Sequence, residues 1–154
     1  MKLAFHAFDV GPAQNHMLVA TEAILRGHTV SCHGGGALGE LDPLATDPDV
    51  LVTAISSFRS EEEITLGLRA IERGIPWVVL TDTHEAWRRP PVKEHAGKVS
   101  VLIVAHPEET ALAEGEWGYR RAVFLGYPPL WGRTLGTIPS RDATRAKIKK
   151  SRPS

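Results

Sequence analysis

The stretch WVVLTDTHEAW places an acid and an imidazole, Asp82 and His84, two residues apart and directly after a run of apolar residues. The apolar run predicts a buried strand, and the two polar side chains follow at its end. A carboxylate and an imidazole at this spacing on an irregular segment can act as a general base and its orienting partner, which together remove a proton from a hydroxyl group. Asp82 and His84 are therefore the predicted catalytic residues.

Other polar side chains follow the ends of the remaining predicted strands. The carboxyl ends of parallel strands meet at one edge of a sheet, where open α/β sheets bind their ligands, so these side chains are predicted to line one substrate site. Taken singly, each also has a structural explanation, as a cap, a turn residue or a satisfied buried histidine. The predicted substrate-binding residues at these strand ends are His6, Asp9, His33, Ser56, Ser57, His106 and Glu108.

A glycine-rich segment, GGGALG, follows the second predicted strand. Gly34, Gly35 and Gly36 would let the backbone approach a phosphate or a sugar closely, so they join the predicted substrate site. Gly34, Gly36 and Gly39 also match the spacing of a GxGxxG motif. The segment follows the second strand and leads into Leu-Asp-Pro rather than into a helix, so we expect an acceptor loop and not a dinucleotide site.

Two further chemistries fit the sequence less well. Several imidazoles with a carboxylate can bind zinc, but the sequence has no HxxxH, HExxH or paired-cysteine spacing. A serine nucleophile would require a GxSxG turn, and the sequence has none. We therefore predict no metal ligands and no cofactor.

An alternation of strands and helices must position these side chains. Short, mostly apolar runs alternate with segments of helical periodicity, which predicts an α/β, Rossmann-like, three-layer domain with a mostly parallel sheet. Ser60 and Glu63 have the spacing of a capping box at the start of the second helix. The predicted strands are 2–8, 28–33, 50–55, 77–81, 99–105 and 122–125, and the predicted helices are 12–26, 60–73 and one from 107 to 115 or 118.

The length and composition of the chain predict one cytoplasmic domain. A chain of 154 residues can build one core, and no apolar run approaches the roughly 18 residues of a membrane-spanning helix. The single cysteine, Cys32, fits a reducing compartment. Basic and acidic residues balance at 18 each, but residues 1–140 hold only 12 basic against 17 acidic side chains. The folded body thus lacks the basic excess of a nucleic-acid binder, so nucleic acid is not a predicted partner.

The junction ILRGHTV, residues 24–30, ends a predicted helix with glycine and enters the next strand at once. With the strand, loop and helix before it, this junction resembles the opening of GT-B-type glycosyltransferases. The segments DVLVTAISSF, GIPWVVLTDTHEAW and VSVLIVAHPEE resemble the third, fourth and fifth strands of the N-terminal half of these enzymes. FLGYPPLWG and then SRDATRAKI resemble the passage toward their second domain, so the resemblance covers nearly the whole chain.

The resemblance implies a single GT-B-like half, the acceptor-binding half of a nucleotide-sugar-dependent glycosyltransferase. Residues 1–135 would form the Rossmann-like N-terminal domain, and residues 136–154 would form a linker and basic tail toward a second domain. In this family the second domain binds the nucleotide-sugar donor. The resemblance covers only the first domain, so the chain is expected to be a truncated or split half, or a half kept for another purpose. The implied partners are a hydroxyl-bearing acceptor and a nucleotide sugar held by a separate domain, with a donor domain or a second copy of the chain as the protein partner.

The resemblance also implies roles for particular residues. It assigns deprotonation of the acceptor hydroxyl to Asp82 or His84, and it adds Asn15 to the acceptor side of the cleft. Two other functions stay open. The chain could be a non-catalytic module that binds a sugar, a nucleotide or a protein, or it could be a relative of nucleotide-sugar epimerases or hydrolases.

Overall fold

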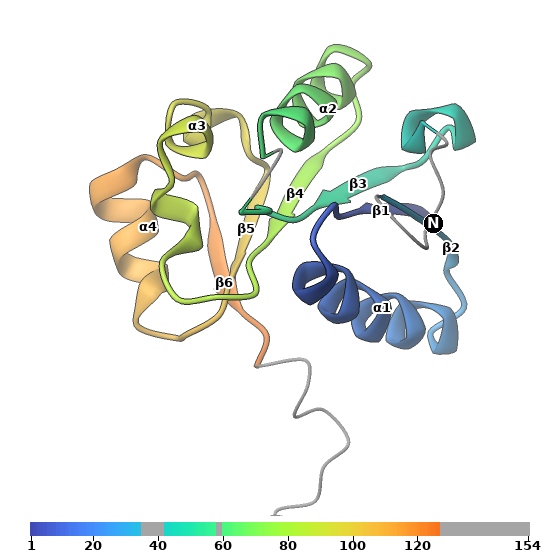
Figure 1. The fold of residues 1–154 in the computed structure, drawn as a ribbon, viewed down its shortest axis with the longest axis horizontal. Coiled ribbons are helices and arrows are strands. Elements are labelled where there is room, and N and C mark those ends of the chain that lie inside the picture. The colour runs from blue at the N-terminus through green and yellow to red at the C-terminus, as the bar shows by residue number, and fades with distance from the viewer. Residues whose placement is uncertain (35–41, 58–59, 127–154) are drawn as a thin grey trace, which may run out of the picture.

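The computed structural model describes residues 1–34, 42–57 and 60–126 of the chain. Within them, six parallel strands form one sheet in the order β2-β1-β3-β4-β5-β6 (Figure 1), which confirms the predicted α/β class. The strands are β1 (Lys2–His6), β2 (Thr29–His33), β3 (Val50–Thr53), β4 (Trp77–Leu80), β5 (Val101–Val104) and β6 (Ala122–Phe124). The α-helices are α1 (Val10–Leu25), α2 (Ser60–Glu72), α3 (Pro90–Lys93) and α4 (Glu109–Trp117).

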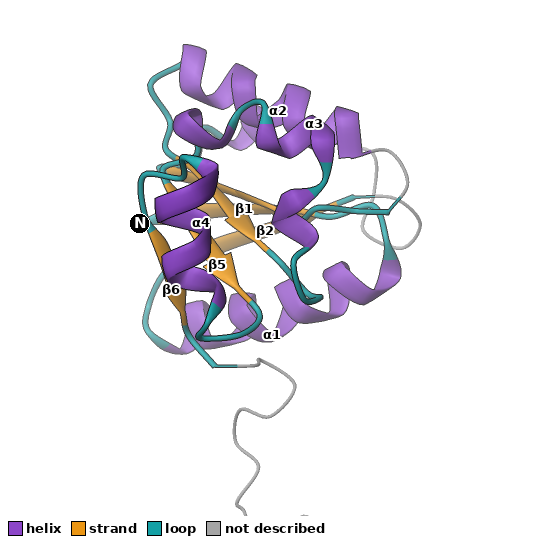
Figure 2. Cartoon of the chain, turned by 90° about the vertical axis from the view of Figure 1, so that its left-hand side faces the viewer, coloured by secondary structure: helices purple, strands orange, loops and turns teal. Residues whose placement is uncertain are grey.

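The helices cover the sheet from two sides and give the domain three layers (Figure 2). α2, α3 and α4 pack on one face, where the core is built around Trp77, Trp87 and Leu102. α1 packs on the other face, where Phe5 and Leu80 belong to a second, smaller core cluster. Burial of the strands on both faces explains why their sequences are apolar throughout rather than alternating.

All six predicted strands are present, but each ends one or two residues earlier than predicted or begins one or two residues later. The first helix also differs, because α1 begins at Val10 and not at residue 12. Asp9 takes the N-cap position, and its carbonyl oxygen accepts the Ala13 N–H at 3.0 Å. At the other end, Gly27 adopts φ 81° and turns the chain toward β2, as the predicted stop requires.

The segment between β4 and β5 folds into short helical turns: η3 (Ala86–Arg88), α3 and η4 (Ala96–Lys98). Trp87 anchors this segment because its side chain is fully buried and its carbonyl oxygen accepts the Tyr119 hydroxyl at 2.9 Å. A further 3-10 turn, η2 (Pro43–Thr46), lies directly before β3. The segment between β4 and β5 is thus folded and forms part of the face of the domain that carries α2.

The strand order sets the place of the site. β1 pairs with β2 on one side and with β3 on the other, so the chain leaves β1 and β3 in diverging directions at their carboxyl ends. Sheets of this order bind ligands in the crevice that opens at such a switch point. No helix among the described residues is long and apolar enough to cross a membrane. The predicted domain boundary at residue 135 lies outside the described residues.

Candidate functional site

The carboxyl ends of β1 and β3 are joined by polar groups from both loops. Asp9 follows β1, and its carboxylate accepts the Ser57 N–H at 2.5 Å. In return, the Asp9 N–H donates to the Ser56 hydroxyl oxygen at 3.1 Å. These two hydrogen bonds hold the first turn of α1 against the exit of β3. Asp9, Ser56 and Ser57, three of the predicted substrate-binding residues, therefore lie together.

A buried glutamate on α2 holds the loops after β1 and β3 together. Glu63, in the first turn of α2, is 1% exposed and accepts the Phe8 N–H at 3.2 Å. It also accepts the Ser56 N–H at 2.7 Å and the Ser56 hydroxyl at 2.6 Å. Burial raises the pKa of Glu63, while its hydrogen bonds favour the ionised form. The predicted capping box assigned Glu63 to its own helix; the structure shows that it fixes the loops after β1 and β3.

Asp82 lies at the same edge, after β4 and against the start of α1. A Cβ atom added to Gly11 would lie 3.3 Å from Oδ2 of Asp82, so the glycine lets the first turn of α1 approach this carboxylate closely. Partial burial raises the pKa of Asp82 above its ordinary value, and the Asp9 charge acts in the same direction. The guanidinium of Arg89 acts against this rise. Arg89 itself is held by a hydrogen bond from Nη1 to the Ile55 carbonyl at 2.7 Å.

His84 does not pair with Asp82 in the described part of the chain. Its exposed ring lies edge-to-face with that of His106, at 5.0 Å between centroids. The Nδ1 atom of His106 lies 4.0 Å from Glu108. The predicted Asp–His pair is thus split: Asp82 lies beside the first turn of α1, and His84 belongs to an exposed group with His106 and Glu108 after β4 and β5.

A second buried glutamate holds that exposed group in place. Glu109, in the first turn of α4, is 0% exposed and accepts the backbone N–H of Glu85. It also accepts the Trp87 indole N–H at 3.0 Å and the His106 N–H at 2.8 Å. The loops after β4 and β5 are therefore tied together in the same way as the loops after β1 and β3.

The remaining predicted residues lie at the ends of β1 and β2 and are buried. His6 and His33 are paired in register, and both are under 10% exposed. His16 lies nearby on α1, where burial, aided by the charge of His6, lowers its pKa to about 3. Asn15 is 5% exposed. This group belongs to the packing of α1 on β1 and β2, so it does not offer its side chains to a ligand in the structure described.

Gly34 closes the end of β2 in a conformation that requires glycine. Its φ is +146°, and an added Cβ would lie 2.0 Å from the Ala7 carbonyl oxygen. The close approach is to the backbone that directly follows β1, and contact of Gly34 with a ligand stays a prediction. Gly35 and Gly36, also predicted to bind substrate, lie outside the described residues.

The polar group at the switch point is therefore Asp9, Ser57 and Asp82 with Gly11 and Arg89, of which sequence reasoning missed the last two. Gly11 is not part of any recognisable sequence motif, and Arg89 lies in a segment with no hydrophobic periodicity. Within the described residues, no set of three or more His, Cys, Asp or Glu side chains could hold a metal ion. Among the described residues, this group contains two carboxylates and one guanidinium, a set suited to hydrogen-bonding a polar ligand and to accepting a proton.

Comparison with protein-family models, with curated proteins and with solved structures gives no match for this chain. The function therefore has to be inferred from the chemistry of the polar group at the switch point.

Proposed function

We propose that the domain binds a hydroxyl-bearing ligand in the crevice between the ends of β1 and β3, and that Asp82 accepts the proton of that hydroxyl. In the specific form that the GT-B resemblance implies, the ligand is a glycosyl acceptor and this chain is the acceptor-binding half of a glycosyltransferase. The observation that carries the proposal is the position of Asp82, half-buried at the switch-point edge against the first turn of α1. Ligands of open α/β sheets bind at this edge.

The surroundings of Asp82 suit a general base. Its pKa is raised by burial, which brings the proton affinity of the carboxylate closer to what a base needs near neutral pH. Arg89 supplies a countercharge that favours the ionised carboxylate and opposes the effect of the nearby Asp9 on its pKa. In transfer, the acceptor oxygen would form a bond to the anomeric carbon, its proton would pass to Asp82, and the nucleotide would leave with the electrons of the broken carbon–oxygen bond.

His84 takes a different part in this proposal from the one its spacing suggested. Since it lies against His106 and is exposed, it would contact the distal part of the ligand rather than orient Asp82. His106 and Glu108 would belong to the same outer contact. A nucleotide-sugar donor would be supplied by a separate domain, because Arg89 is the one cation of this polar group among the described residues, and its Nη1 already donates to the Ile55 carbonyl.

A binding module without catalysis is the second candidate. The observation that favours it is the same countercharge: an acid compensated by Arg89 also serves as a structural group or a hydrogen-bond acceptor for a ligand. The two candidates share the crevice and differ in whether Asp82 changes its protonation when a ligand binds.

The test is a ¹⁵N-labelled sample of the whole chain, titrated with methyl glycosides, free nucleotides and nucleotide sugars. If the proposal holds, the glycosides shift the backbone amide signals of Gly11, Ser57 and Asp82, and free nucleotides leave them unchanged. Shifts caused by nucleotides at these amides would instead indicate a stand-alone nucleotide module. If neither glycosides nor nucleotides shift these amide signals, the proposed site binds neither class of ligand.

The carboxyl ¹³C signal of Asp82 separates catalysis from binding. A general base in contact with the acceptor hydroxyl should show a pKa that changes when the glycoside is bound. Asp82→Asn should keep glycoside affinity within about threefold, and Asp47→Asn is the matched control. An unchanged Asp82 titration in the saturated complex would support the binding module.

A further inference from the structure

The outer side of α1 is apolar where a surface helix normally carries charge. Val10, Met17 and Ile24 recur every seven residues, and Leu18 and Leu25 do the same, so the five side chains lie along one side of the helix. They are between 42% and 78% exposed. A helix that is apolar on its outer side as well as its inner side is expected to be covered from both.

Polar residues on this side do little to solvate it. Gln14 and Thr21 are the only polar residues that lie between the five apolar side chains on this side of the helix. The Thr21 hydroxyl donates to the Met17 carbonyl at 2.8 Å. From Val10 to Thr21 the helix contains no charged residue. α2 differs, because charged side chains occupy its exposed positions at Glu61, Glu62 and Arg69. The apolar outer side is thus a property of α1 and not of the helices of this domain in general.

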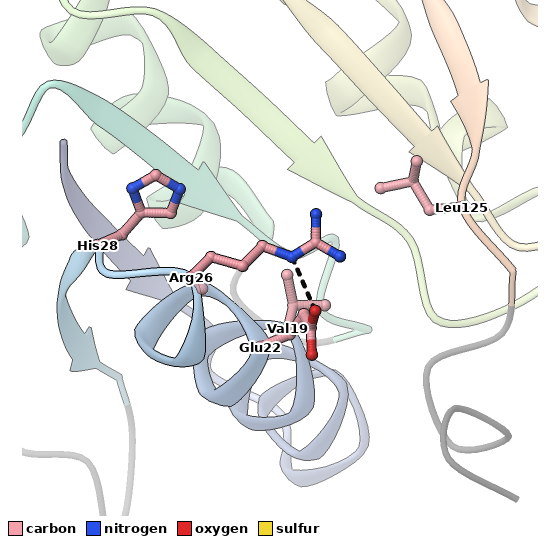
Figure 3. A pocket seen from close by; sticks show the side chains of 6 residues that line it. Val19, Glu22, Arg26, His28 and Leu125 are labelled. Carbon is pink, nitrogen blue, oxygen red and sulfur yellow. Dashed lines mark hydrogen bonds and ion pairs between the residues drawn. The ribbon is translucent and has the colours of Figure 1, made fainter.

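A groove runs along one edge of the same helix (Figure 3). Its volume is about 510 Å³, and Leu125, just after β6, lies across it from α1. The one ion pair on its wall joins Glu22 to Arg26 at 2.7 Å, so this pair is neutral as a unit. The groove is lined by Val19, Glu22, Ala23, Arg26, His28 and Leu125.

The sheet beside the groove is also incompletely covered. α1 packs against β1 and β2, and no other described helix lies on this face (Figure 1). Val78 on β4 and Ile103 on β5 belong to the core cluster of this face, yet they are only partly buried. Parallel sheets in α/β proteins normally have both faces covered, so a further layer is expected here.

We infer that this surface is the interface of a homodimer, in which α1 of a second copy packs beside α1 of the first around a two-fold axis. We call it the α1 surface and define it by Val10, Met17, Leu18, Ile24, Leu25 and Leu125. A two-fold interface uses the same patch on both copies, and an uncharged apolar helix face is complementary to itself. The chain has no net charge at pH 7, so the copies do not repel each other at long range.

The size of the α1 surface agrees with this occupant. At their exposed fractions the six side chains present on the order of 600 Å², the upper limit expected for the largest apolar patch of a monomer. With the groove and the partly buried Val78 and Ile103 beside it, the face approaches the roughly 800 Å² that each partner buries in a standard interface. The inference does not depend on the proposed function, because Asp82, Asp9 and Ser57 are not part of this face.

The test is the molar mass of the whole chain by light scattering and by sedimentation over a range of concentrations. The wild-type chain should have about twice its monomer mass of 16.8 kDa. Leu18→Lys combined with Leu25→Lys should raise the dimer dissociation constant at least about 100-fold, because the charges would have to be desolvated at the centre of the interface. Ala111→Lys, on the exposed side of α4, is the matched control and should leave the dimer intact.

Far-ultraviolet circular dichroism of the double variant shows whether the domain still folds, and the substituted positions favour that outcome because they are exposed. A wild-type chain that is monomeric at 100 μM (roughly 100 times the Kd of a micromolar dimer) would overturn the inference, whether the face is then covered by residues 127–154, by another protein or by lipid. A dimer that the double variant leaves unchanged would also overturn it.

Discussion

At the residue scale, two buried carboxylates organise the edge that carries the candidate site. Glu63 joins the loops after β1 and β3, and Glu109 joins those after β4 and β5, each from the first turn of a helix. Their sequence context did not reveal this, since a glutamate in a first helical turn is equally expected as an exposed partner of the helix dipole. The polar residues expected at the strand ends do lie there, and their role in binding stays a prediction. Which of them are covered depends on contacts between distant segments.

His16 is a buried histidine whose two ring nitrogens have no hydrogen-bond partner in the structure described. Its ring packs edge-to-face on Phe5 at 5.6 Å. An unsatisfied buried polar group costs stability, so His16→Leu should raise the free energy of unfolding by about 1 kcal/mol at pH 7. Urea unfolding followed by tryptophan fluorescence measures this change. A loss of stability on substitution would mean that the imidazole makes a stabilising polar contact.

The same residue should make the wild-type domain sensitive to mild acid. Its folded pKa of about 3 is below its ordinary value of 6.5, so between these values the unfolded chain binds a proton that the folded chain does not. Stability therefore falls as the pH falls below 6.5, by about 2 kcal/mol at pH 5 from this group alone. His16→Leu should lack this part of the decline. His106→Gln, at an exposed position, should retain it.

At the element scale, strands were easier to predict than connections. Continuous apolar runs such as WVVL and VLIV predicted β4 and β5 because burial on both faces leaves few alternatives. The short helices between them were not predicted, since four-residue turns such as α3 are fixed by tertiary anchors like Trp87 and not by their own periodicity. The early start of α1 has a similar cause, because Asp9 is placed at its N-cap by the exit of β3.

Two helical glycines should respond to alanine in opposite directions. An added Cβ at Gly67 on α2 would lie 2.1 Å from the Trp77 ring, so Gly67→Ala forces α2 away from β4 and should cost about 2–3 kcal/mol. At Gly115 on α4 nothing lies within 4 Å, so Gly115→Ala should add about 0.5–1 kcal/mol through helix propensity. Urea denaturation of both variants gives the comparison. Equal effects would show that α2 does not pack on Trp77 at this distance.

At the scale of the whole molecule, the sequence predicted the layers but not the order of the strands. Alternating strands and helices imply a parallel sheet, yet the position of β1 between β2 and β3 follows from pairings that local patterns do not encode. That order decides which polar residues meet. It brings Asp82 close to Gly11 and Asp9, which are over 70 positions away in sequence. It leaves His84, which is only two positions from Asp82, outside this group.

The strand order also leaves α1 as the one described helix on its face of the sheet, with an apolar outer side, and this links stability to association. If the folded chain is dimeric and the unfolded chain is not, mass action stabilises the folded state as the concentration rises. The midpoint of thermal unfolding should then increase by about 2 °C for each tenfold increase in concentration. Differential scanning calorimetry from 5 to 500 μM (roughly 5–500 times a micromolar Kd) measures this slope. The slope should disappear in the Leu18→Lys, Leu25→Lys variant and persist in Ala111→Lys. A wild-type midpoint that is independent of concentration would contradict the dimer and would show that the folded state is a stable monomer.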